Sequence, residues 1–465
     1  MTVLEVEDRK VAVIGAGASG LAAAELLVRR GAEVILNDRR ERDALDPRAL
    51  ALEGQGVTLA LGSHDPAFFE GVELVVLSPG VPPIPELAEL FRDVEVIGEV
   101  ELASRFLGAP LIAITVTNGK STVTTLVGEM LRRSGFVTFL GGNLGRAACE
   151  AVGSEADTPD GRVVLELSSF QLEKVRLLRP KVAALLNLSP DHLDRYKSQD
   201  DYARAKSNIF AAQRRGDHAV LPANDDVCKQ LGPMTANVGR HGFGGQDGIV
   251  RVEGDALVDL KTGWSLPLSE ILLQGRHNHE NAAAAVLVAR IAGASPEAMS
   301  ETLREVGGLP HRAAKVRELD GVTYIDDSKA TNVGATVAAL DGLASPSKKA
   351  VLIAGGVDKG GSYAPLVERL ASVGRAVVLI GKSAQLIARE MASLRLPIRF
   401  ADSMEAAVNE ARSLAEAGDL VLLAPACSSF DMFRSYAHRG DVFQDAVRAL
   451  PETAAAAEEE NGGAA

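Results

Sequence analysis

Short hydrophobic runs recur along the chain, and segments with helical periodicity follow most of them. Runs of three to seven apolar residues predict buried strands, because helices cover both faces of a parallel sheet. The predicted strands are residues 11–14, 34–36, 73–77, 94–97, 111–114, 162–167, 182–188, 322–325, 350–354, 376–380 and 420–423. Strands that alternate with helices predict an α/β protein with mostly parallel sheets.

The intervening segments show the spacing of amphipathic helices. In residues 123–131, apolar side chains recur at i, i+3, i+4, i+7 and i+8, which predicts a helix with one buried face. Residues 21–30 and 282–291 also predict helices, and residues 140–145 predict a Gly-rich turn. Residues 216–274 contain short strand patterns and turns, typical of a small β region.

Composition limits the possible classes of protein. The 465 residues are 46% hydrophobic and 24% charged, which predicts about three globular domains. A net charge of −13 argues against a general nucleic-acid or anionic-membrane binder. Three widely spaced cysteines favour a reducing, cytoplasmic compartment, and neither a signal peptide nor a membrane span is evident. We expect the acidic, small-residue tail 451–465 to be disordered.

A first Gly-rich turn follows the first predicted strand. Gly15-Ala16-Gly17-Ala18-Ser19-Gly20 lies between a strand and a helix, and an acid follows at Asp38. This GxGxxG pattern places a phosphate at a helix N-terminus. Taken alone, it predicts NAD or FAD, although the glycines do not identify the ligand that carries the phosphate. The expected pyrophosphate pocket consists of Ala18, Ser19, Asp38, Arg39 and Ser78–Gly80.

A second phosphate loop lies in the segment Thr115–Thr122. Here Gly119-Lys120-Ser121 joins the strand 111–114 to the helix that contains residues 123–131. A lysine at this place neutralises a terminal phosphate, and a serine hydroxyl can ligate Mg²⁺. The match is incomplete, because Ile114 stands where the usual pattern has glycine. Two phosphate loops fit a transferase or a ligase better than a dehydrogenase.

Other polar residues in the middle of the chain have structural interpretations, and most of them also have functional ones. Glu166 ends an apolar strand, either as a cation ligand or as an exposed strand-end acid. His192 lies among acids, where a satisfied surface or core histidine is more usual than a functional one. The spacing around Lys206 predicts a solvated helix lysine. Asn278 and Asn281 share one helix face, as N-caps or as amides that recognise a base.

Polar clusters follow the strands in the last third of the chain. They occupy residues 326–332, 355–360 and 427–431, and such residues bind ligands at the carboxyl ends of parallel strands. Residues 308–311 are the expected hinge into this region.

Four strings together carry a resemblance to a known family. They are residues 117–130, 165–173, 308–312 and 327–332. The chain resembles the Mur ligase family over residues 8–450, in particular the members that add D-glutamate. The resemblance implies three domains: a UDP-binding Rossmann-like domain (1–104), a P-loop ATPase-like domain (105–308) and a Rossmann-like domain for the amino acid and ATP (309–450). It also implies that the first Gly-rich turn binds UDP rather than a dinucleotide.

The resemblance further implies a set of site residues. The implied ATP contacts are Thr117, Asn118, Gly119, Lys120, Ser121, Thr122, Asn278, Asn281, Arg312, Asp327 and Lys329. Those for the UDP substrate are Ala18, Ser19, Asp38, Arg39, Ser78, Gly80, Asn143 and Gln171. Those for D-glutamate are Lys329, Thr331, Lys359, Ser429, Phe430 and Tyr436. Ser121, Glu166, His192 and a carbamylated Lys206 would serve two Mg²⁺ ions, and Lys120, Glu166, His192 and Lys206 would be catalytic.

The implied reaction uses ATP to join D-glutamate to UDP-N-acetylmuramoyl-L-alanine through an acyl phosphate, in cytoplasmic peptidoglycan precursor synthesis, with a monomer as the expected form. Alternatives are another muramyl ligase, a folylpolyglutamate synthase, which lacks the UDP domain, or an NAD- or FAD-dependent oxidoreductase. The chain departs from the family pattern at Val116, where the family has glycine. If that position needs a positive φ, valine costs about 1–3 kcal/mol of strain, and we expect Val116→Gly to bind ATP equally well or better.

Overall fold

The computed structural model describes residues 4–452, except 83, 193, 194, 234, 236, 274 and 309. The chain forms two compact units. One consists of residues 1–188, 200–274 and 278–306, and the other of residues 189–199, 275–277 and 307–465. Most of the expected tail, residues 453–465, lies outside the described residues. Among the helices that the structure describes, none combines the length and hydrophobicity that a membrane crossing needs.

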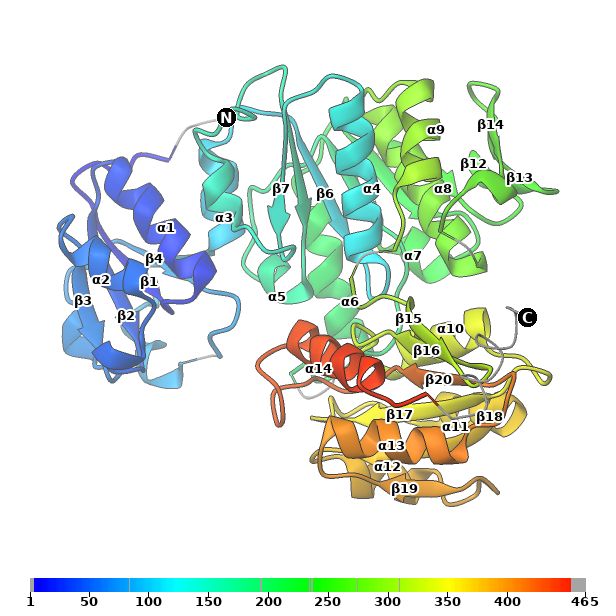
Figure 1. Ribbon diagram of the computed structural model, residues 1–465. Helices are drawn as coiled ribbons and strands as arrows, with labels where there is room; N and C mark the ends of the chain where they lie inside the picture. The colour runs from blue at the N-terminus through cyan, green and yellow to red at the C-terminus, as the bar shows by residue number, and fades with distance from the viewer. Residues whose placement is uncertain are drawn as a thin grey trace, which may run out of the picture. The chain divides into compact units, whose positions relative to one another are not determined.

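The first sheet of the larger unit is parallel throughout, in the order β3-β2-β1-β4-β5. Its strands are β1 (Lys10–Ile14), β2 (Glu33–Asp38), β3 (Thr58–Leu61), β4 (Leu74–Leu77) and β5 (Glu95–Gly98), and its helices are α1 (Ala18–Arg29), α2 (Pro47–Glu53) and α3 (Glu99–Phe106). α1 packs against β1 and β2 (Figure 1). Gly20 permits this packing, since a Cβ there would lie 1.8 Å from the Gly15 carbonyl oxygen.

The second sheet of this unit has nine strands, in the order β14-β13-β12-β11-β10-β9-β6-β8-β7. The strands are β6 (Leu111–Thr115), β7 (Thr138–Gly142), β8 (Arg162–Glu166), β9 (Val182–Leu185), β10 (His218–Pro222), β11 (Gly239–Phe243), β12 (Val250–Glu253), β13 (Ala256–Asp259) and β14 (Trp264–Pro267). The helices are α4 (Lys120–Arg133), α5 (Ser169–Leu172), α6 (Gln199–Ser207), α7 (Asp226–Gln230), α8 (Arg276–Ile291) and α9 (Pro296–Glu305). The β6 side chains alternate between two cores: Ile112 and Ile114 pack with α4 and α8, whereas Leu111 and Ala113 join the core on the other face.

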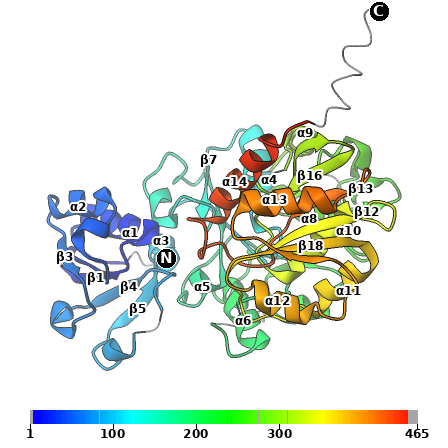
Figure 2. The ribbon, with the colours of Figure 1, turned by 60° about the horizontal axis from the view of Figure 1, so that its bottom comes forward.

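The smaller unit contains a six-stranded sheet in the order β15-β16-β20-β17-β18-β19. Its strands are β15 (Ala314–Leu319), β16 (Val322–Asp326), β17 (Ala350–Gly355), β18 (Gly374–Ile380), β19 (Ile398–Phe400) and β20 (Leu420–Leu423), and its helices are α10 (Val333–Leu343), α11 (Ala364–Val373), α12 (Ala384–Glu390), α13 (Met404–Leu414) and α14 (Tyr436–Arg448). Side chains of α10, α11 and α12 form one core with this sheet, and those of α13 and α14 form the other (Figure 2). Only β15 is antiparallel to its neighbour.

Every strand predicted from an apolar run is present, but some boundaries were wrong. Residues 140–142, predicted as part of a turn, lie in β7, and the strand predicted over 182–188 ends at Leu185. The sequence pattern missed β7 because its glycines are typical of a turn. Glycine is nevertheless required at position 142, since a Cβ on Gly142 would lie 2.2 Å from the Glu166 carbonyl oxygen. α8 begins six residues before the predicted helix, at Arg276.

Glu99, the first residue of α3, is a buried carboxyl group. Its Oε1 accepts a hydrogen bond from the Cys149 backbone N–H at 2.6 Å, whereas its Oε2 is buried without a hydrogen-bond partner among the described residues. Burial raises the pKa of Glu99 to about 7. All three cysteines, Cys149, Cys228 and Cys427, are also buried and form no disulfide.

We expect Glu99→Gln to flatten the dependence of stability on pH. An unfolded glutamate titrates near 4.5, so between that pH and 7 the folded chain binds more protons and loses stability as pH rises. Above pH 7 the variant should be more stable than the parent, by up to about 3 kcal/mol. Denaturant unfolding from pH 4.5 to 8 measures this. Glu297→Gln, at an exposed first-turn acid of α9, is the control, and an unchanged pH profile for Glu99→Gln would contradict the assignment.

Candidate active site

The second phosphate loop turns sharply from β6 into α4, which has 14 residues. Gly119 makes this turn in the left-handed region, at φ +97°. A Cβ on Gly119 would lie 2.4 Å from Asn281 Oδ1, so the α8 amide lies directly against the loop. The loop and Asn281, both expected around ATP, therefore meet at the N-terminus of α4, where backbone N–H groups favour an anion.

Two lysines donate to one oxygen of this loop. Lys120 Nζ lies 2.6 Å from the Val116 carbonyl oxygen and 3.0 Å from that of Thr117. Lys206 Nζ lies 2.9 Å from the same Val116 oxygen and 3.3 Å from Thr115 Oγ1. The two ammonium groups therefore share one acceptor in the same loop, and like charges this close repel each other.

Lys206 is not the solvated helix lysine that its spacing predicted. It is only 1% exposed and lies 4.8 Å from the centre of the Tyr202 ring. The error arose because helical spacing shows which residues share a face, but not which segment covers that face. Here α6 turns Lys206 toward β6, which is far from it in sequence.

Two residues that the sequence did not single out support the loop. The buried Tyr202 hydroxyl lies 3.1 Å from Thr117 Oγ1. Asn187 makes a two-way amide pair with Asn118: its Oδ1 accepts from the backbone N–H at 3.1 Å, and its Nδ2 donates to the carbonyl oxygen at 2.8 Å. Asn187 directly follows an apolar run, as polar residues at strand ends do in ligand sites, and this was the available signal.

Glu166 is buried rather than exposed at its strand end. Its Oε1 accepts from Asn143 Nδ2 at 2.7 Å, while Oε2 is buried without a hydrogen-bond partner among the described residues. A buried carboxylate oxygen of this kind suits a cation. Ser121 is also buried, in the first turn of α4. No cluster of three or more His, Cys, Asp or Glu side chains that could hold a metal occurs within the described part of the chain.

The other expected residues of this region have local structural roles. Gln171 is buried in α5, where its Oε1 accepts from the Ser168 backbone N–H at 2.9 Å and completes a capping box. Asn278 lies in the first turn of α8, one helical turn before Asn281. Thr122 is buried in α4. Their substrate contacts stay predictions.

Val116 is not strained in the way that the sequence suggested. It is absent from the described residues with positive φ, so its backbone does not need glycine. Its side chain is fully buried in the core with α4 and α8. Both lysines contact the loop through the Val116 carbonyl oxygen, and a residue of any type at this position would have that oxygen.

The first Gly-rich turn is held by Asp38 at the end of β2. Asp38 Oδ2 accepts from the Ala16 backbone N–H at 2.7 Å, and Arg40 pairs with the same carboxylate at 2.8 Å. Burial acts to raise the pKa of Asp38, but the hydrogen bonds from Arg40 and Ala16 outweigh it and hold the pKa at about 2. Arg40, which the sequence missed, thus pairs with the acid, although Arg40 is exposed as Arg39 is.

Other members of the expected UDP set surround the same turn. Ala18 and Ser19 open α1, and Gly80 follows β4. Ser78 is buried and donates its hydroxyl to the Gly15 carbonyl oxygen at 2.9 Å. These residues therefore lie together at one edge of the sheet, at the carboxyl ends of β1, β2 and β4.

In the smaller unit, the segment after β16 carries two of the expected residues. The Lys329 ammonium lies 3.8 Å from the centre of the Tyr436 ring, a cation–π contact. Burial raises the pKa of Asp327 to about 6, although the positive charge of Arg312 acts to lower it. Arg312 lies between two left-handed residues, His311 (φ +61°) and Ala313 (φ +47°), which fixes the backbone at the expected hinge.

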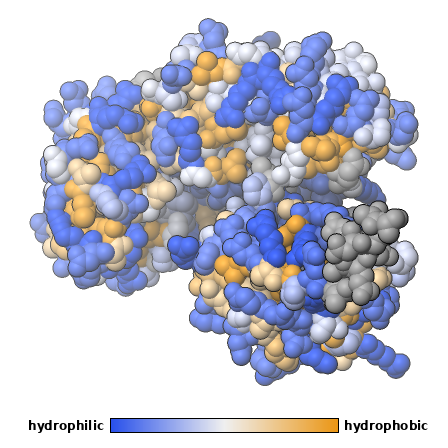
Figure 3. Space-filling model, viewed as in Figure 1, coloured by the Kyte–Doolittle hydropathy of each residue, from blue (hydrophilic) through white to orange (hydrophobic). Residues whose placement is uncertain are grey.

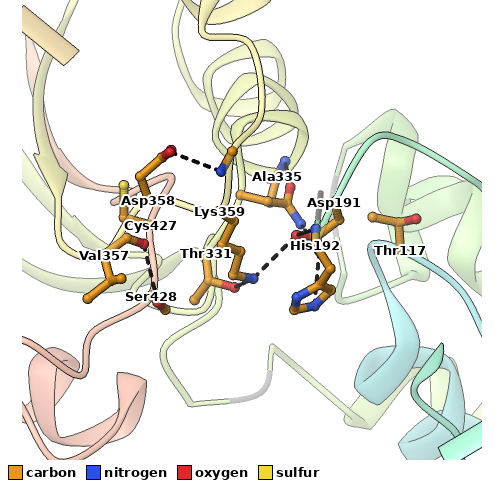
Figure 4. A network of polar contacts seen from close by, with 12 residues as sticks. Thr117, Asp191, His192, Thr331, Ala335, Val357, Asp358, Lys359, Cys427 and Ser428 are labelled. Atoms are coloured by element: carbon orange, nitrogen blue, oxygen red, sulfur yellow. Dashed lines mark hydrogen bonds and ion pairs between the residues drawn. The ribbon is translucent and has the colours of Figure 1, made fainter. Parts of the chain in front are cut away.

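Lys359 lies in a polar group of the smaller unit (Figure 4). Its Nζ is 3.5 Å from Thr331 Oγ1 and 3.4 Å from Asp191 Oδ1. Asp191 also accepts from Asn332 Nδ2 at 3.1 Å, and its Oδ2 lies 3.7 Å from His192 Nε2. Lys359 and Thr331, both expected in the amino-acid pocket, therefore meet. His192 lies in this unit and Glu166 in the other, and their shared metal role stays a prediction.

Ser429 and Phe430 follow β20 and differ in exposure. Ser429 is buried, whereas the Phe430 side chain is 75% exposed, the highest value among the large hydrophobic residues described. The face drawn in Figure 3 is mainly hydrophilic, with hydrophobic residues scattered over it. An aromatic ring this exposed on a loop suits ligand contact.

Comparison with known proteins matches three domain models to the chain. They are the Mur ligase MurD-like N-terminal domain over residues 9–98, the Mur ligase middle domain over 114–289, and the Mur ligase glutamate ligase domain over 311–427. The UDP-N-acetylmuramoylalanine–D-glutamate ligase of Pelobacter propionicus is 43% identical over 459 residues, covering 96% of this chain and 100% of its own. That of Geobacter metallireducens is 42% identical over 458 residues, covering 96% and 99%.

Solved structures show the same fold. The MurF ligase of Thermotoga maritima in complex with ADP has a TM-score of 0.60 at 17% identity, covering 96% of both chains. The UDP-N-acetylmuramate–alanine ligase MurC of the same organism has a TM-score of 0.58 at 20% identity, covering 94% of this chain and 99% of its own. Identities this low support the fold alone.

We expect Val116→Gly to destabilise the protein. The change removes a fully buried side chain and frees the unfolded backbone, so the free energy of unfolding should fall by about 2–4 kcal/mol. ATP affinity should not fall, because the carbonyl group remains. Denaturant unfolding and ATP titration measure the two effects separately. Val116→Ala should show about half the loss of stability, and an unchanged stability of Val116→Gly would mean that the core does not depend on this side chain.

Proposed function

Because the chain belongs to the Mur ligase family, and within it to the UDP-N-acetylmuramoylalanine–D-glutamate ligases, we propose that it joins D-glutamate to UDP-N-acetylmuramoyl-L-alanine. ATP is the energy source, and ADP and phosphate are the products. The proposal covers a monomeric, cytoplasmic enzyme of peptidoglycan precursor synthesis. The near-complete coverage of relatives with this name supports it.

One observation of the molecule supports the ATP site above all: the Lys120 ammonium lies at the N-terminus of α4, where it donates to the Val116 and Thr117 carbonyl oxygens. ATP and both co-substrates are anions, and the chain as a whole carries −13. Such substrates need a local site of positive charge. Asn281 lies against the same loop and suits a contact to the nucleotide, as does Asn278 one turn earlier in α8.

The reaction consists of two displacements. A carboxylate oxygen of the L-alanyl group attacks the γ-phosphorus of ATP, and ADP leaves. The amine of D-glutamate then attacks the acyl carbon, an N–H proton is lost, and phosphate leaves as the amide forms. Lys120 offsets the negative charge that accumulates on the transferred group, and the main task of the protein is to orient anionic reactants.

Glu166 at the end of β8 and Ser121 at the start of α4 fit a magnesium ion by their chemistry. The buried Glu166 Oε2 has no hydrogen-bond partner among the described residues, and the Ser121 hydroxyl group lies in the first turn of α4. These two side chains would hold the ion, with His192 assigned to a second one. Bound magnesium would neutralise phosphate charge. Asn143 holds the other oxygen of Glu166 and so orients the carboxylate.

Lys206 is proposed to carry a carbamate. The ammonium groups of Lys206 and Lys120, which share one acceptor, repel each other. Loss of a proton gives the neutral Lys206 amine, its nitrogen bonds to the carbon of CO₂ as a second proton leaves, and the resulting carbamate anion offers oxygen ligands. Lys206 is 1% exposed beside Tyr202, which shields such a group from solvent.

The remaining assignments follow the family pattern and the local geometry. Arg312, Asp327 and Lys329 would contact ATP. The amino-acid pocket would be formed by Lys329, Thr331, Lys359, Ser429, Phe430 and Tyr436. The UDP end of the substrate would bind at Ala18, Ser19, Asp38, Arg39, Ser78 and Gly80, with Asn143 and Gln171 nearer the muramoyl group. Arg40, which holds Asp38, is added here as a support of the UDP site.

The direct test is release of ADP. We expect turnover only when ATP, UDP-N-acetylmuramoyl-L-alanine and D-glutamate are all present, measured by a coupled ADP assay and by mass of the product. A panel of other amino acids, L-glutamate included, is the control. Absence of turnover with these substrates, together with oxidation or reduction of a nicotinamide cofactor, would overturn the proposal.

The carbamate is tested on Lys206. We expect Lys206→Ala to lose at least about 100-fold in kcat and acetate to restore part of it, because a small carboxylate supplies the missing oxygen atoms. The parent should show a carbamate signal in ¹³C NMR after exposure to ¹³C-bicarbonate, and the variant should lack it. Full activity of the variant without acetate would remove this role.

A further inference from the structure

Two loops of the smaller unit carry residues of the proposed amino-acid pocket, and they are joined through their backbones. The loop after β17 carries Lys359, and the loop after β20 carries Ser429. Val357 and Ser428 exchange backbone hydrogen bonds at 2.9 and 3.1 Å, and Ser428 Oγ donates to the Val357 carbonyl oxygen at 3.2 Å (Figure 4). The spacing between the two pocket residues therefore depends on this junction.

Asp358 closes the backbone around its neighbour Lys359. One carboxylate oxygen accepts from the Gly360 backbone N–H at 2.9 Å. The other accepts from the Tyr363 hydroxyl at 2.8 Å. The Asp358 carboxylate thus holds the backbone at Gly360, directly after Lys359, and links it to Tyr363, the residue that precedes α11.

The Tyr363 hydroxyl extends the contact to the second loop. It lies 3.3 Å from Cys427 Sγ, and both side chains are almost fully buried, at 2% and 0% exposed. The hydroxyl has one proton, which it donates to the carboxylate, so the Cys427 thiol donates to the hydroxyl oxygen. Burial raises the pKa of both groups and keeps both protonated as donors.

Ser383 anchors the network from a third turn, between β18 and α12. Its hydroxyl and its backbone N–H both donate to the Gly356 carbonyl oxygen, at 2.8 and 2.9 Å. Its Oγ also lies 3.2 Å from Cys427 Sγ. Gly356 has φ +138°, and a Cβ there would lie 2.1 Å from the Ser428 carbonyl oxygen, so the loops pack without room for a side chain.

From this geometry we propose that Asp358 and Tyr363 are positioning residues for the amino-acid substrate. They hold the backbone of Lys359 at a fixed distance from Ser429, so that an ammonium and a hydroxyl are ready for the substrate carboxylates. Neither residue is assigned to contact the substrate. The inference rests on the proposed amino-acid pocket, and it adds the residues that set the geometry of that pocket.

The test is Tyr363→Phe, which keeps the ring and removes only the hydroxyl. Loss of one hydrogen bond to a half-buried carboxylate should loosen the loop and raise KM for D-glutamate about 10-fold. The KM values for ATP and for UDP-N-acetylmuramoyl-L-alanine, and kcat, should stay within about twofold. Tyr324→Phe, at a tyrosine of β16 that is also only 1% exposed, is the control and should leave every constant unchanged.

A second pair of variants keeps the inference testable if Tyr363→Phe folds poorly. Asp358→Asn keeps an oxygen for the Gly360 N–H and an amide for the tyrosine hydroxyl, so most of the D-glutamate affinity should remain. Asp358→Ala loses both contacts and should raise KM for D-glutamate at least about 10-fold. The positioning role would be overturned if Asp358→Asn and Asp358→Ala had equal KM values for D-glutamate, or if KM rose equally for all three substrates.

Lys359→Ala separates this inference from the pocket on which it rests. We expect that variant to raise KM for D-glutamate more than Tyr363→Phe does. If Lys359→Ala changes nothing, the pocket assignment fails and the inference fails with it. If Lys359→Ala weakens D-glutamate binding while Tyr363→Phe and Asp358→Ala do not, the pocket stands and only the positioning role is wrong.

Discussion

The approach of Lys120 and Lys206 to one carbonyl oxygen is the constraint on which the site depends. Two buried or half-buried ammonium groups can share an acceptor only where the surrounding backbone holds them there. The loop after β6 supplies the oxygen, the left-handed Gly119 turns the chain, and α6 carries the second lysine beside Tyr202. The result is a pair of lysines that share one acceptor beside the N-terminus of α4, in a protein whose net charge is negative.

The three sheets repeat one solution to the problem of ligand binding. In each, polar residues stand at the carboxyl ends of parallel strands, while the rest of the strand is buried. In the first sheet an acid orders a Gly-rich turn, in the second two lysines donate to one oxygen of a loop, and in the third a half-buried acid and a buried tyrosine order a loop that carries a lysine. The groups proposed to face the substrates differ, but in each sheet the loop is held by hydrogen bonds to its own backbone.

Sequence patterns predicted most of the parallel strands and the two Gly-rich turns, because burial on both faces leaves a clear apolar run. They did not predict β3 or β15, nor β7, where close backbone approach requires glycine, nor the edge strand β19, which is only three residues long. They indicated β10 to β14 only as one small β region. Motifs located Lys120 and Glu166. The helical spacing wrongly predicted that Lys206 is solvated. The sequence patterns also did not single out Arg40, Asn187 or Tyr363, because the roles of these residues come from contacts across the fold. The boundaries expected at residues 104 and 308 stay predictions.

The burial of all three cysteines has a practical consequence for following the motions of this protein. Cys149 and Cys228 lie in one core of the larger unit, and Cys427 lies in a core of the smaller one. A thiol reagent reaches a buried sulfur only when the surrounding segment opens. The rate of labelling at each cysteine, read by mass spectrometry, therefore works as a native reporter of local opening. No probe has to be introduced, and Cys427 reports on the amino-acid loops themselves.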